Sequence, residues 1–347
     1  MSIEIFIFVL IGILSGIITG LTPGIHVNLV SALLVSIAAS LAGIAPPLAL
    51  ACFIIAMAVT HTFLDSIPSI FLGAPEESTA LGVLPGHRFL LKGLGRQAVH
   101  LTIIGSLAGA ILSITLFPFF TLVIKTIYPF IKGSVGWILL VVASTMIIKD
   151  RRSIWALFIF AAAGLLGVVV LSSPMQQPLF PLLSGMFGIS TLAYSLLSAQ
   201  RIPKQHDIPL QIDTSTIIKA SGAGQCSGFL TAMLPGLGAG TAAVIGRTLT
   251  RKMHDGGFLI LLGSITTVNF VLSIATLATI QKARNGAIVA VMDLVGAAQG
   301  VTIIVMLCVA LFAAGIATIL AVALTKKFCA LIQRVSYPRL IISIMLF

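Results

Sequence analysis

The sequence predicts an all-α polytopic membrane protein, and three observations support this fold class. Of the 347 residues, 58% are hydrophobic and 8% are charged, and the mean hydropathy is +1.17. Apolar runs near the spanning length of roughly 20 residues follow one another almost without pause. A short motif that contains Pro-Gly also occurs twice. We therefore expect about 10–12 transmembrane segments or half-helices, arranged in two inverted repeats with Pro-Gly broken hairpins.

The repeated motif places the same five residue types at a constant offset of 212 positions. Proline breaks a helix, and the backbone groups that it frees inside a membrane need protein or a wet cavity around them. One copy alone favours a simple kink between closely packed helices. Two copies in register favour the binding site of a transporter. The copies are Ser15, Gly16, Thr19, Pro23 and Gly24, then Ser227, Gly228, Thr231, Pro235 and Gly236.

The net charge of +11 comes from basic residues in short loops between apolar runs. In a soluble chain this charge would suggest nucleic-acid binding, but the loop positions favour positive-inside topology, so no nucleic-acid partner is expected. The first residues lack the basic region and cleavage site of a signal peptide, and we expect the first span to be retained. The four cysteines show no paired spacing, which argues against a disulfide framework or a thiolate metal site.

Residues 1–200 are the predicted first half, with additional spans after its repeat. Apolar arms flank the first Pro-Gly, and the run from Leu48 is broken by Pro68 and Pro75. The basic stretch at 85–96 is predicted to be cytoplasmic, and the amphipathic region at 125–132 to lie on the outer side. The predicted arms and spans are 5–22, 26–43, 98–117, 134–148, 154–171 and 179–199.

Residues 201–214 are a predicted cytoplasmic linker, and 215–347 are the second half. Basic residues follow the second Pro-Gly hairpin, at Arg247, Arg251 and Lys252, whereas the outer ends of the first hairpin carry none. This difference predicts that the repeat is inverted. A weaker similarity at an offset of 207 adds one broken helix to each half. The predicted segments are 217–234, 237–248, 257–280 and 298–324, with a last apolar stretch to Phe347.

Half-helices that begin after each break are the predicted substrate contacts, because their free N–H groups and positive dipole ends suit a carboxylate or phosphate. Side chains after the first break add donors, and glycines after the second let a ligand approach the backbone. Hydroxyl residues beyond Pro75 are suited to cap a further half-helix. The predicted substrate-binding residues are Pro23, Gly24, His26, Asn28, Ser78, Thr79, Pro235, Gly236, Gly238, Gly240, Thr241 and Asn269.

Ionisable residues within apolar segments are the candidates for cation coupling. His61 and Asp65 share one face if their stretch stays helical, and a mutually satisfied pair near the interface is an equally weighted alternative. The tip around Glu76 could also be a solvated loop. Two ligands make no coordination sphere, so we expect no metal site and no cofactor beyond Na⁺ or H⁺ as coupling ion. The predicted ion-coupling residues are His61, Asp65, Glu76, Glu77 and Asp293.

The two Pro-Gly copies and the stretch from Ile67-Pro-Ser-Ile-Phe-Leu-Gly-Ala-Pro75 to Lys92-Gly93 resemble the large membrane subunit of tripartite tricarboxylate transporters, the TctA-type family. In the second half, Ala232-Met-Leu-Pro235-Gly236-Leu-Gly238 carries the same resemblance. It implies a cation-coupled permease for a small organic anion, such as a di- or tricarboxylate, that works by alternating access in the cell membrane. It also implies two partners, a small membrane subunit and an extracytoplasmic binding protein.

Two other functions are alternatives. The stretch from Pro235 to Thr241 is similar to the Pro-Gly-x-Ser-Gly-Gly-Thr motif of a polyprenyl-phosphate flippase family, which implies a lipid phosphate on the same half-helix. An intramembrane enzyme using His61, Asp65 or Cys226 ranks last. The pattern around Cys226 imitates a nucleophile elbow, but no α/β sheet is predicted to carry it. We therefore expect that the protein is not an enzyme.

Overall fold

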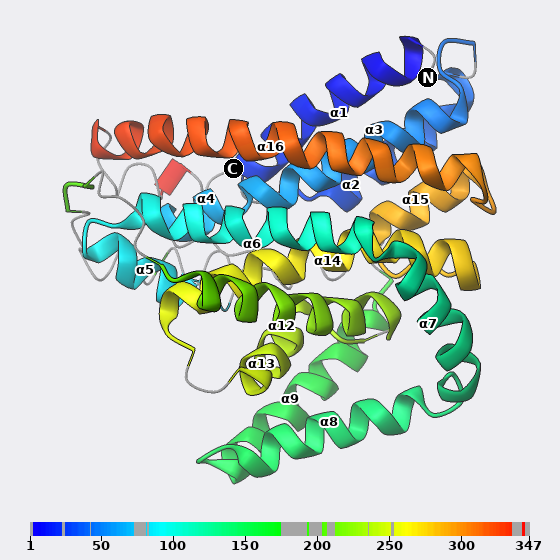
Figure 1. The fold of residues 1–347 in the computed structure, drawn as a ribbon. Coiled ribbons are helices and arrows are strands. Elements are labelled where there is room, and N and C mark those ends of the chain that lie inside the picture. Colours follow the sequence, from blue (N-terminus) through cyan, green and yellow to red (C-terminus); the bar gives the residue numbers. More distant parts are fainter. Residues whose placement is uncertain are drawn as a thin grey trace.

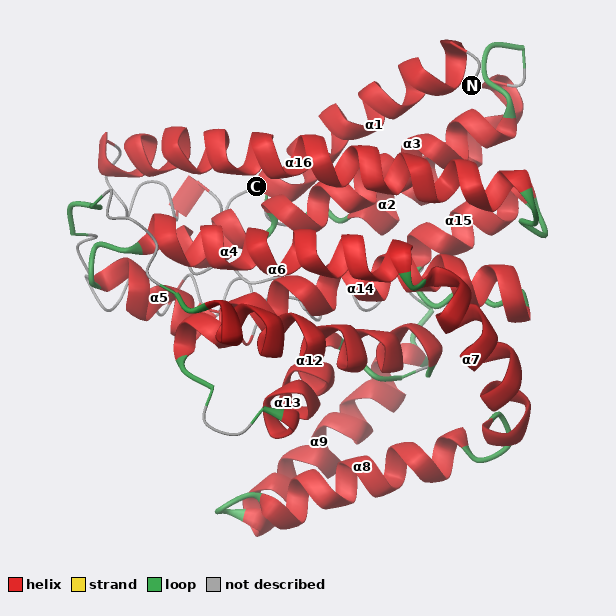
Figure 2. Cartoon of the chain, in the orientation of Figure 1, coloured by secondary structure: helices red, strands yellow, loops and turns green. Residues whose placement is uncertain are grey.

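The computed structural model is all-α in the part of the chain that it describes, as predicted. Figure 2 shows helices joined by short loops and turns, with no strand among the coloured residues. The described residues are 3–22, 25–41, 43–72, 81, 83–174, 193, 203–206, 212–234, 236–250, 253–334 and 342–343. The predicted span at 179–199 and most of the last apolar stretch therefore lie outside the described residues.

The helices fall into two sets, one in each half of the chain (Figure 1). The first set is α1 (Ile3–Leu21), α2 (Val27–Ile37), the 3₁₀ helix η1 (Ala38–Leu41), α3 (Pro47–Leu64), α4 (Ser66–Leu72), α5 (Val83–Leu91), α6 (Gly95–Thr115), α7 (Phe117–Ile131), α8 (Val135–Lys149) and α9 (Ser153–Leu171). The second set is α12 (Thr214–Met233), α13 (Ala239–Leu249), α14 (Asp255–Ile280), α15 (Gly286–Val295) and α16 (Val301–Arg334).

Six helical segments among the described residues are long and apolar enough to cross a membrane, and the bent pair α7–α8 adds a seventh if it is one span. The two arms of the bent pair meet at 93°. Two shorter apolar segments, Val27–Leu41 and Gly286–Val295, are half-helices by length. The six segments are Ile3–Leu21, Pro47–Leu72, Gly95–Thr115, Ser153–Leu171, Asp255–Ile280 and Val301–Leu331.

The segment of α3 and α4 is interrupted at Asp65, a single turn residue that keeps helical backbone angles. Pro68 explains this position, because it has no N–H for the carbonyl of Leu64 and its ring crowds that carbonyl. The chain continues as α4 after a single turn residue. All residues of α4 are buried, so protein surrounds the break.

The helices of the two halves recur in the same order and with closely matched lengths. α1 and α12 have 19 and 20 residues, and α2 and α13 have 11 each. The 26-residue segment of α3 and α4 corresponds to the 26-residue α14. α5 and α15 follow, with nine and ten residues. The similarity between the halves thus extends over four successive segments of structure.

Glycines of the repeated motif bring the first helix of each half against its third. Gly12 and Gly16 lie against the carbonyls of Phe53 and Met57 on α3. The residues 212 positions later, Gly224 and Gly228, lie against the carbonyls of Leu261 and Ile265 on α14. Small residues at such contacts let membrane helices approach closely. Successive glycines meet successive carbonyls in the same order, so each pair of helices is parallel.

The third helices of the two halves, α3 and α14, run in opposite directions. α6 is antiparallel to α3, because Thr102 donates to Ser66 (2.9 Å) and Ser106 donates to the carbonyl of Thr62 (3.5 Å). α6 is parallel to α14, where Gly105 and Gly109 meet the carbonyls of Ile260 and Ser264 in turn. The colour gradients of Figure 1 show the same opposition of α3 and α14.

Each half also packs one later helix against the third helix of the other half. α6 of the first half packs along α14, and α16 of the second half packs along α3. By contrast, no described residue of α8 or α9 is buried, and Trp137 and Trp155 are exposed on them. In Figure 1 these two helices lie apart from the central bundle.

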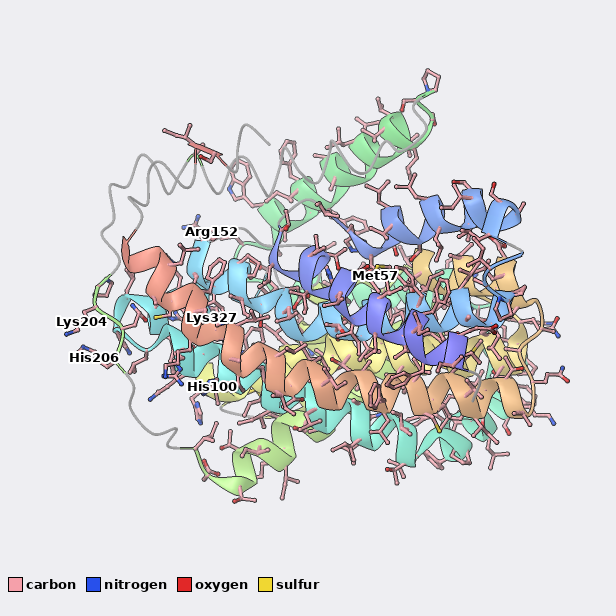
Figure 3. The ribbon with its side chains drawn as sticks, turned by 90° about the horizontal axis from the view of Figure 1, so that it is seen from above. Met57, His100, Arg152, Lys204, His206 and Lys327 are labelled. Atoms are coloured by element: carbon pink, nitrogen blue, oxygen red, sulfur yellow. The ribbon has the colours of Figure 1, made fainter. Side chains whose placement is uncertain are left out.

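Basic residues gather at one end of the bundle. Figure 3 shows Lys204, His206, His100 and Lys327 together at that end. The described part of the linker is bound there, because the N–H of His206 donates to the carbonyl of Gly93 (2.8 Å). Positive-inside topology would make this the cytoplasmic end.

Candidate functional site

The tip of the first hairpin joins α1, α2 and α3 through two histidines and a threonine. His26 caps α2, its ring nitrogen Nδ1 accepting from the N–H of Asn28 (3.1 Å). Its ring centroid lies 5.7 Å from that of His61, which is buried. Nδ1 of His61 lies 3.2 Å from the hydroxyl of Thr19. The structure therefore brings together a predicted substrate contact and a predicted coupling residue. Pro23 and Gly24 lie outside the described residues.

Asn28 bonds to the second half of the chain. Its side-chain oxygen accepts from the N–H of Ala287 (3.0 Å), in the first turn of α15. Asn285 caps the same helix by accepting from the N–H of Ile288 (2.9 Å). Two of the N–H groups at the start of α15 are thus satisfied by side chains.

The tip of the second hairpin carries no such side chains. Gly238 caps α13 without a side-chain hydrogen bond, and Gly236 adopts a left-handed φ of +80° that favours glycine. A side chain at Gly240 would point toward Leu81, which lies 3.9 Å from the position of its Cβ. Thr241 is half-buried on α13, and Pro235 lies outside the described residues.

Each hairpin tip therefore meets the broken region of the other half. Asn28 contacts Gly286 and Ala287 just after the break between α14 and α15. A Cβ at Gly240, which is 212 residues after Asn28, would lie 3.9 Å from Cδ1 of Leu81, the described residue between α4 and α5. Positions 28 and 240 are therefore equivalent in the two halves, but the first is asparagine and the second is glycine.

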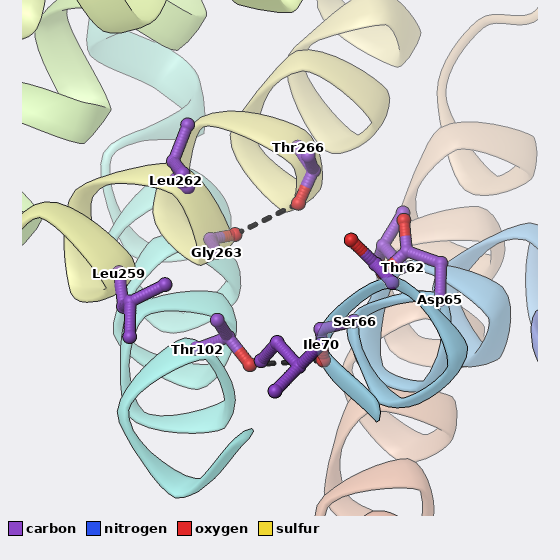
Figure 4. A pocket seen from close by; sticks show the side chains of 10 residues that line it. Thr62, Asp65, Ser66, Ile70, Thr102, Leu259, Leu262, Gly263 and Thr266 are labelled. Carbon is purple, nitrogen blue, oxygen red and sulfur yellow. Dashed lines mark hydrogen bonds between the residues drawn. The ribbon is translucent and has the colours of Figure 1, made fainter. Parts of the chain in front are cut away.

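Asp65 lies in different surroundings from His61. It is buried and lines a cavity of about 20 Å³ together with hydroxyl residues of α3, α4, α6 and α14. Figure 4 shows Thr62, Ser66, Thr102 and Thr266 around this cavity. Its size suits one water or one small ion. His61 contacts Thr19 and His26 at the first hairpin tip.

The remaining predicted residues are scattered. Asn269 is half-buried on α14, and its carbonyl accepts from the hydroxyl of Ser273 (2.6 Å). Asp293 is exposed on α15. Ser78, Thr79, Glu76 and Glu77 lie outside the described residues. Within the described chain, no group of three or more His, Cys, Asp or Glu side chains is arranged to hold a metal ion.

The nucleophile-elbow pattern is part of a helix. Cys226 lies on α12, exposed, and the glycines on either side of it contact α14. A nucleophile elbow is a sharp turn between a strand and a helix, and this segment has neither the turn nor the strand.

A larger cavity, of about 730 Å³, lies between α5, α13 and the start of α14. Arg88 and Asp255 form a salt bridge at its wall, with an N–O distance of 2.8 Å. Arg247 also lines it and places its guanidinium 5.6 Å from the centroid of the Phe258 ring. In the sequence, Arg88 and Arg247 indicate only membrane topology. Their helices, α5 and α13, bring them to one cavity that no local pattern predicts.

The family described as the tripartite tricarboxylate transporter TctA family matches residues 6–347. The chain belongs to this family. It is therefore a multi-pass membrane protein, as the apolar helices also indicate. The resemblance noted in the sequence is confirmed.

An uncharacterized protein, MJ1079, of Methanocaldococcus jannaschii is 29% identical over 244 residues, which are 67% of this chain and 60% of the relative. The chain thus spans about three fifths of the length of this curated relative. No solved structure matches the chain.

Proposed function

We propose that this TctA-family chain is the permease subunit of a secondary transporter for a small organic anion, such as a di- or tricarboxylate, in the cell membrane. The placement of each hairpin tip beside the interrupted region of the other half carries the proposal, with Asn28 bound to Ala287 and Gly240 facing Leu81. Broken helices that meet between two repeats are the usual substrate site of secondary transporters. The family description supports the tricarboxylate class.

The two repeats are inverted in this proposal, and alternating access comes from motion of one half against the other. The opposite directions of α3 and α14 support the inversion. α1 is parallel to α3, and α12 is parallel to α14 in the same way. This correspondence supports two structurally equivalent halves. The exchange of α6 and α16 between the halves would couple their movements.

A cation gradient drives uptake in this proposal, with Asp65 as the ion contact. The small cavity beside Asp65 is lined by a carboxylate and several hydroxyls, which are the oxygen ligands that hard cations prefer. An ionisable residue inside a membrane protein is a candidate for such coupling. The histidine pair at the first hairpin tip is the candidate if the ion is H⁺.

The family also supports two partners, a small membrane subunit and an extracytoplasmic binding protein that delivers the anion. The exposed faces of α8 and α9 are open to lipid or to another protein. These partners belong to the proposal, and the permease itself forms the path across the bilayer.

Thermal stabilisation of the purified protein tests the proposal. The panel contains di- and tricarboxylates and a short polyprenyl phosphate, each with and without sodium and at two pH values. A ligand that binds the folded state raises the melting temperature by mass action. We expect a shift with a carboxylate that depends on sodium or on protons. A shift with polyprenyl phosphate alone would replace the permease with a lipid-phosphate translocase.

A further inference from the structure

The two corresponding hairpin tips differ in whether a side chain fills the contact. In the first half the Asn28 side chain fits against Gly286, where a Cβ would lie 2.7 Å from its Cγ. Its oxygen also binds the N–H of Ala287. In the second half Gly240 has no side chain, and its neighbour Leu81 is 3.9 Å from the Cβ position. One contact is filled and the other is open.

The large cavity begins on the open side. Leu81 lines it, and so does Val244, one helical turn after Gly240 on α13. Its volume of about 730 Å³ lies within the roughly 300–1,000 Å³ that small-molecule sites occupy. At the first tip, Asn28 and the start of α15 occupy the corresponding space.

The charges in the cavity favour an anion. Two arginines and one acid, Asp255, are the charged groups among the described residues that line it. Arg88 is bound to Asp255, and the two side chains keep 59% and 43% of their surface exposed. Arg247 has the Phe258 ring against its guanidinium. A planar guanidinium of this kind holds a carboxylate through paired hydrogen bonds.

We propose that this cavity binds the carboxylate groups of the transported anion, with Arg88 and Arg247 as its cationic contacts and Asp255 as an internal counter-ion that the anion replaces on Arg88. This inference rests on the proposed function and narrows it. Only one of the two corresponding tips holds substrate, because Asn28 closes the other. The Asp255 carboxylate competes with substrate for the same guanidinium, so removal of its charge strengthens binding.

Substitutions of opposite sign test this assignment. The readouts are citrate binding to the purified full chain by calorimetry and the KM for citrate uptake into proteoliposomes. Arg88→Gln and Arg247→Gln each raise the Kd and KM about tenfold, the loss expected for a charge-assisted hydrogen bond. Asp255→Asn lowers both values. Arg151→Gln, on the exposed loop between α8 and α9, is the matched control for net charge and leaves both unchanged.

Two further substitutions separate the two hairpin tips. Gly240→Asn fills the open contact and is expected to weaken citrate binding. Asn28→Ala empties the filled contact and is expected to lower the melting temperature with little change in citrate affinity. The opposite pattern would assign substrate to the first tip and overturn the inference.

The outcomes also distinguish this inference from the proposed function. If the wild-type chain transports citrate and the arginine variants behave like Arg151→Gln, the cavity assignment is wrong and the permease stands. If Asp255→Asn weakens binding as the arginine variants do, the salt bridge is structural and the counter-ion role is wrong. If the wild-type chain neither binds nor transports any carboxylate, both proposals fail.

Discussion

Asn28 links the first hairpin to the second half of the chain, and its side-chain oxygen is the atom that makes the link. It accepts the N–H of Ala287 at the start of α15, where the backbone has no helical partner of its own. Asn28 comes shortly after a Pro-Gly break in the sequence, where a substrate contact was predicted. Its partner lies 259 residues away, and no local pattern could have indicated it.

Replacement of Asn28 by alanine tests this link. The variant leaves one N–H of α15 without its acceptor, and the expected loss of stability is about 1 kcal/mol, as for a lost helix cap. Asn28→Asp keeps an acceptor oxygen and should retain most of the stability. Melting temperatures in detergent measure both, with Ser36→Ala, an exposed residue of the same hairpin, as control. Equal losses for alanine and aspartate would contradict the capping role.

Asp213 caps α12 and gives the molecule a pH-dependent contact outside the spans. The Thr216 hydroxyl (2.7 Å) and the Thr216 N–H (2.8 Å) donate to its carboxylate, and these hydrogen bonds hold the pKa of Asp213 below its ordinary value. A lowered pKa means that the stabilisation is complete above the unfolded-state value, near 3.9. It is lost as the pH falls through the folded-state pKa.

Asp213→Ala should therefore lower the melting temperature at neutral pH, and its difference from wild type should shrink as the pH falls below 4. Ser215→Ala, an exposed neighbour, controls for the loss of a polar side chain. A difference that stays constant or grows on acidification would show that the carboxylate charge is not involved.

At the scale of elements, glycines decide which helices can lie close together. Gly105 on α6 faces the carbonyl of Ile260, and Gly263 on α14 faces the carbonyl of Thr102. A methyl group at either position would overlap a backbone oxygen that belongs to a helix and cannot rotate away. This contact joins α6 of the first half to the third helix of the second half.

Gly105→Ala should destabilise the protein by about 1–3 kcal/mol or prevent folding, as overpacking does. Gly164→Ala, in the middle of α9 with nothing within 4 Å of its Cβ position, is the matched control. It should be neutral or slightly stabilising, because alanine favours a helix more than glycine does. Melting temperatures of the two variants compare them directly. A neutral Gly105→Ala would mean that α6 and α14 are farther apart than described.

The helices themselves were largely predictable, because apolar runs and Pro-Gly breaks are local signals. The expected arms at 5–22 and 26–43 became α1, α2 and η1, and the runs at 217–234 and 237–248 became α12 and α13. The break at Asp65 was expected only as a general interruption near Pro68. What the sequence could not supply was the pairing of helices, since contacts between halves depend on matched surfaces far apart in the chain.

At the scale of the whole molecule, the equivalent loops of the two halves are expected on opposite sides of the membrane. The loop before α3 ends at Pro46 and the loop before α14 ends at His254, and both residues are helix caps at an offset of 208. α3 and α14 run in opposite directions from these caps. Inverted topology follows if both segments cross the bilayer.

Single cysteines test this arrangement. In a background with Cys52, Cys226, Cys308 and Cys329 replaced, Gly43→Cys should react with an impermeant maleimide added to intact cells. Thr250→Cys should react only after the cells are permeabilised. Gly43 has nothing within 4 Å of its Cβ position, so the new side chain is accessible. Labelling of both positions from the same side would contradict the inversion.

The proposed substrate site was predictable only in part, because residues far apart in the sequence come together to form it. The Pro-Gly motifs identified both hairpin tips. The motifs are alike in sequence, so they did not show that the surroundings of the two tips differ in structure. Asn28 is engaged by α15, whereas the cavity beside Gly240 draws its charges from Arg88 and Asp255, 167 residues apart. Arg88 belongs to a basic stretch that indicated topology, Asp255 had no role in the sequence analysis, and the salt bridge between them depends on the folded chain.

Solute counterflow in proteoliposomes measures directly whether the chain carries a carboxylate across the bilayer. The purified chain is reconstituted with unlabelled citrate inside, and labelled citrate is added outside with sodium at two pH values. We predict that labelled citrate accumulates transiently, that empty liposomes without protein show none, and that Arg247→Gln needs a higher citrate concentration for the same rate. Absence of accumulation with every di- and tricarboxylate, together with transfer of polyprenyl phosphate between leaflets, would contradict the account.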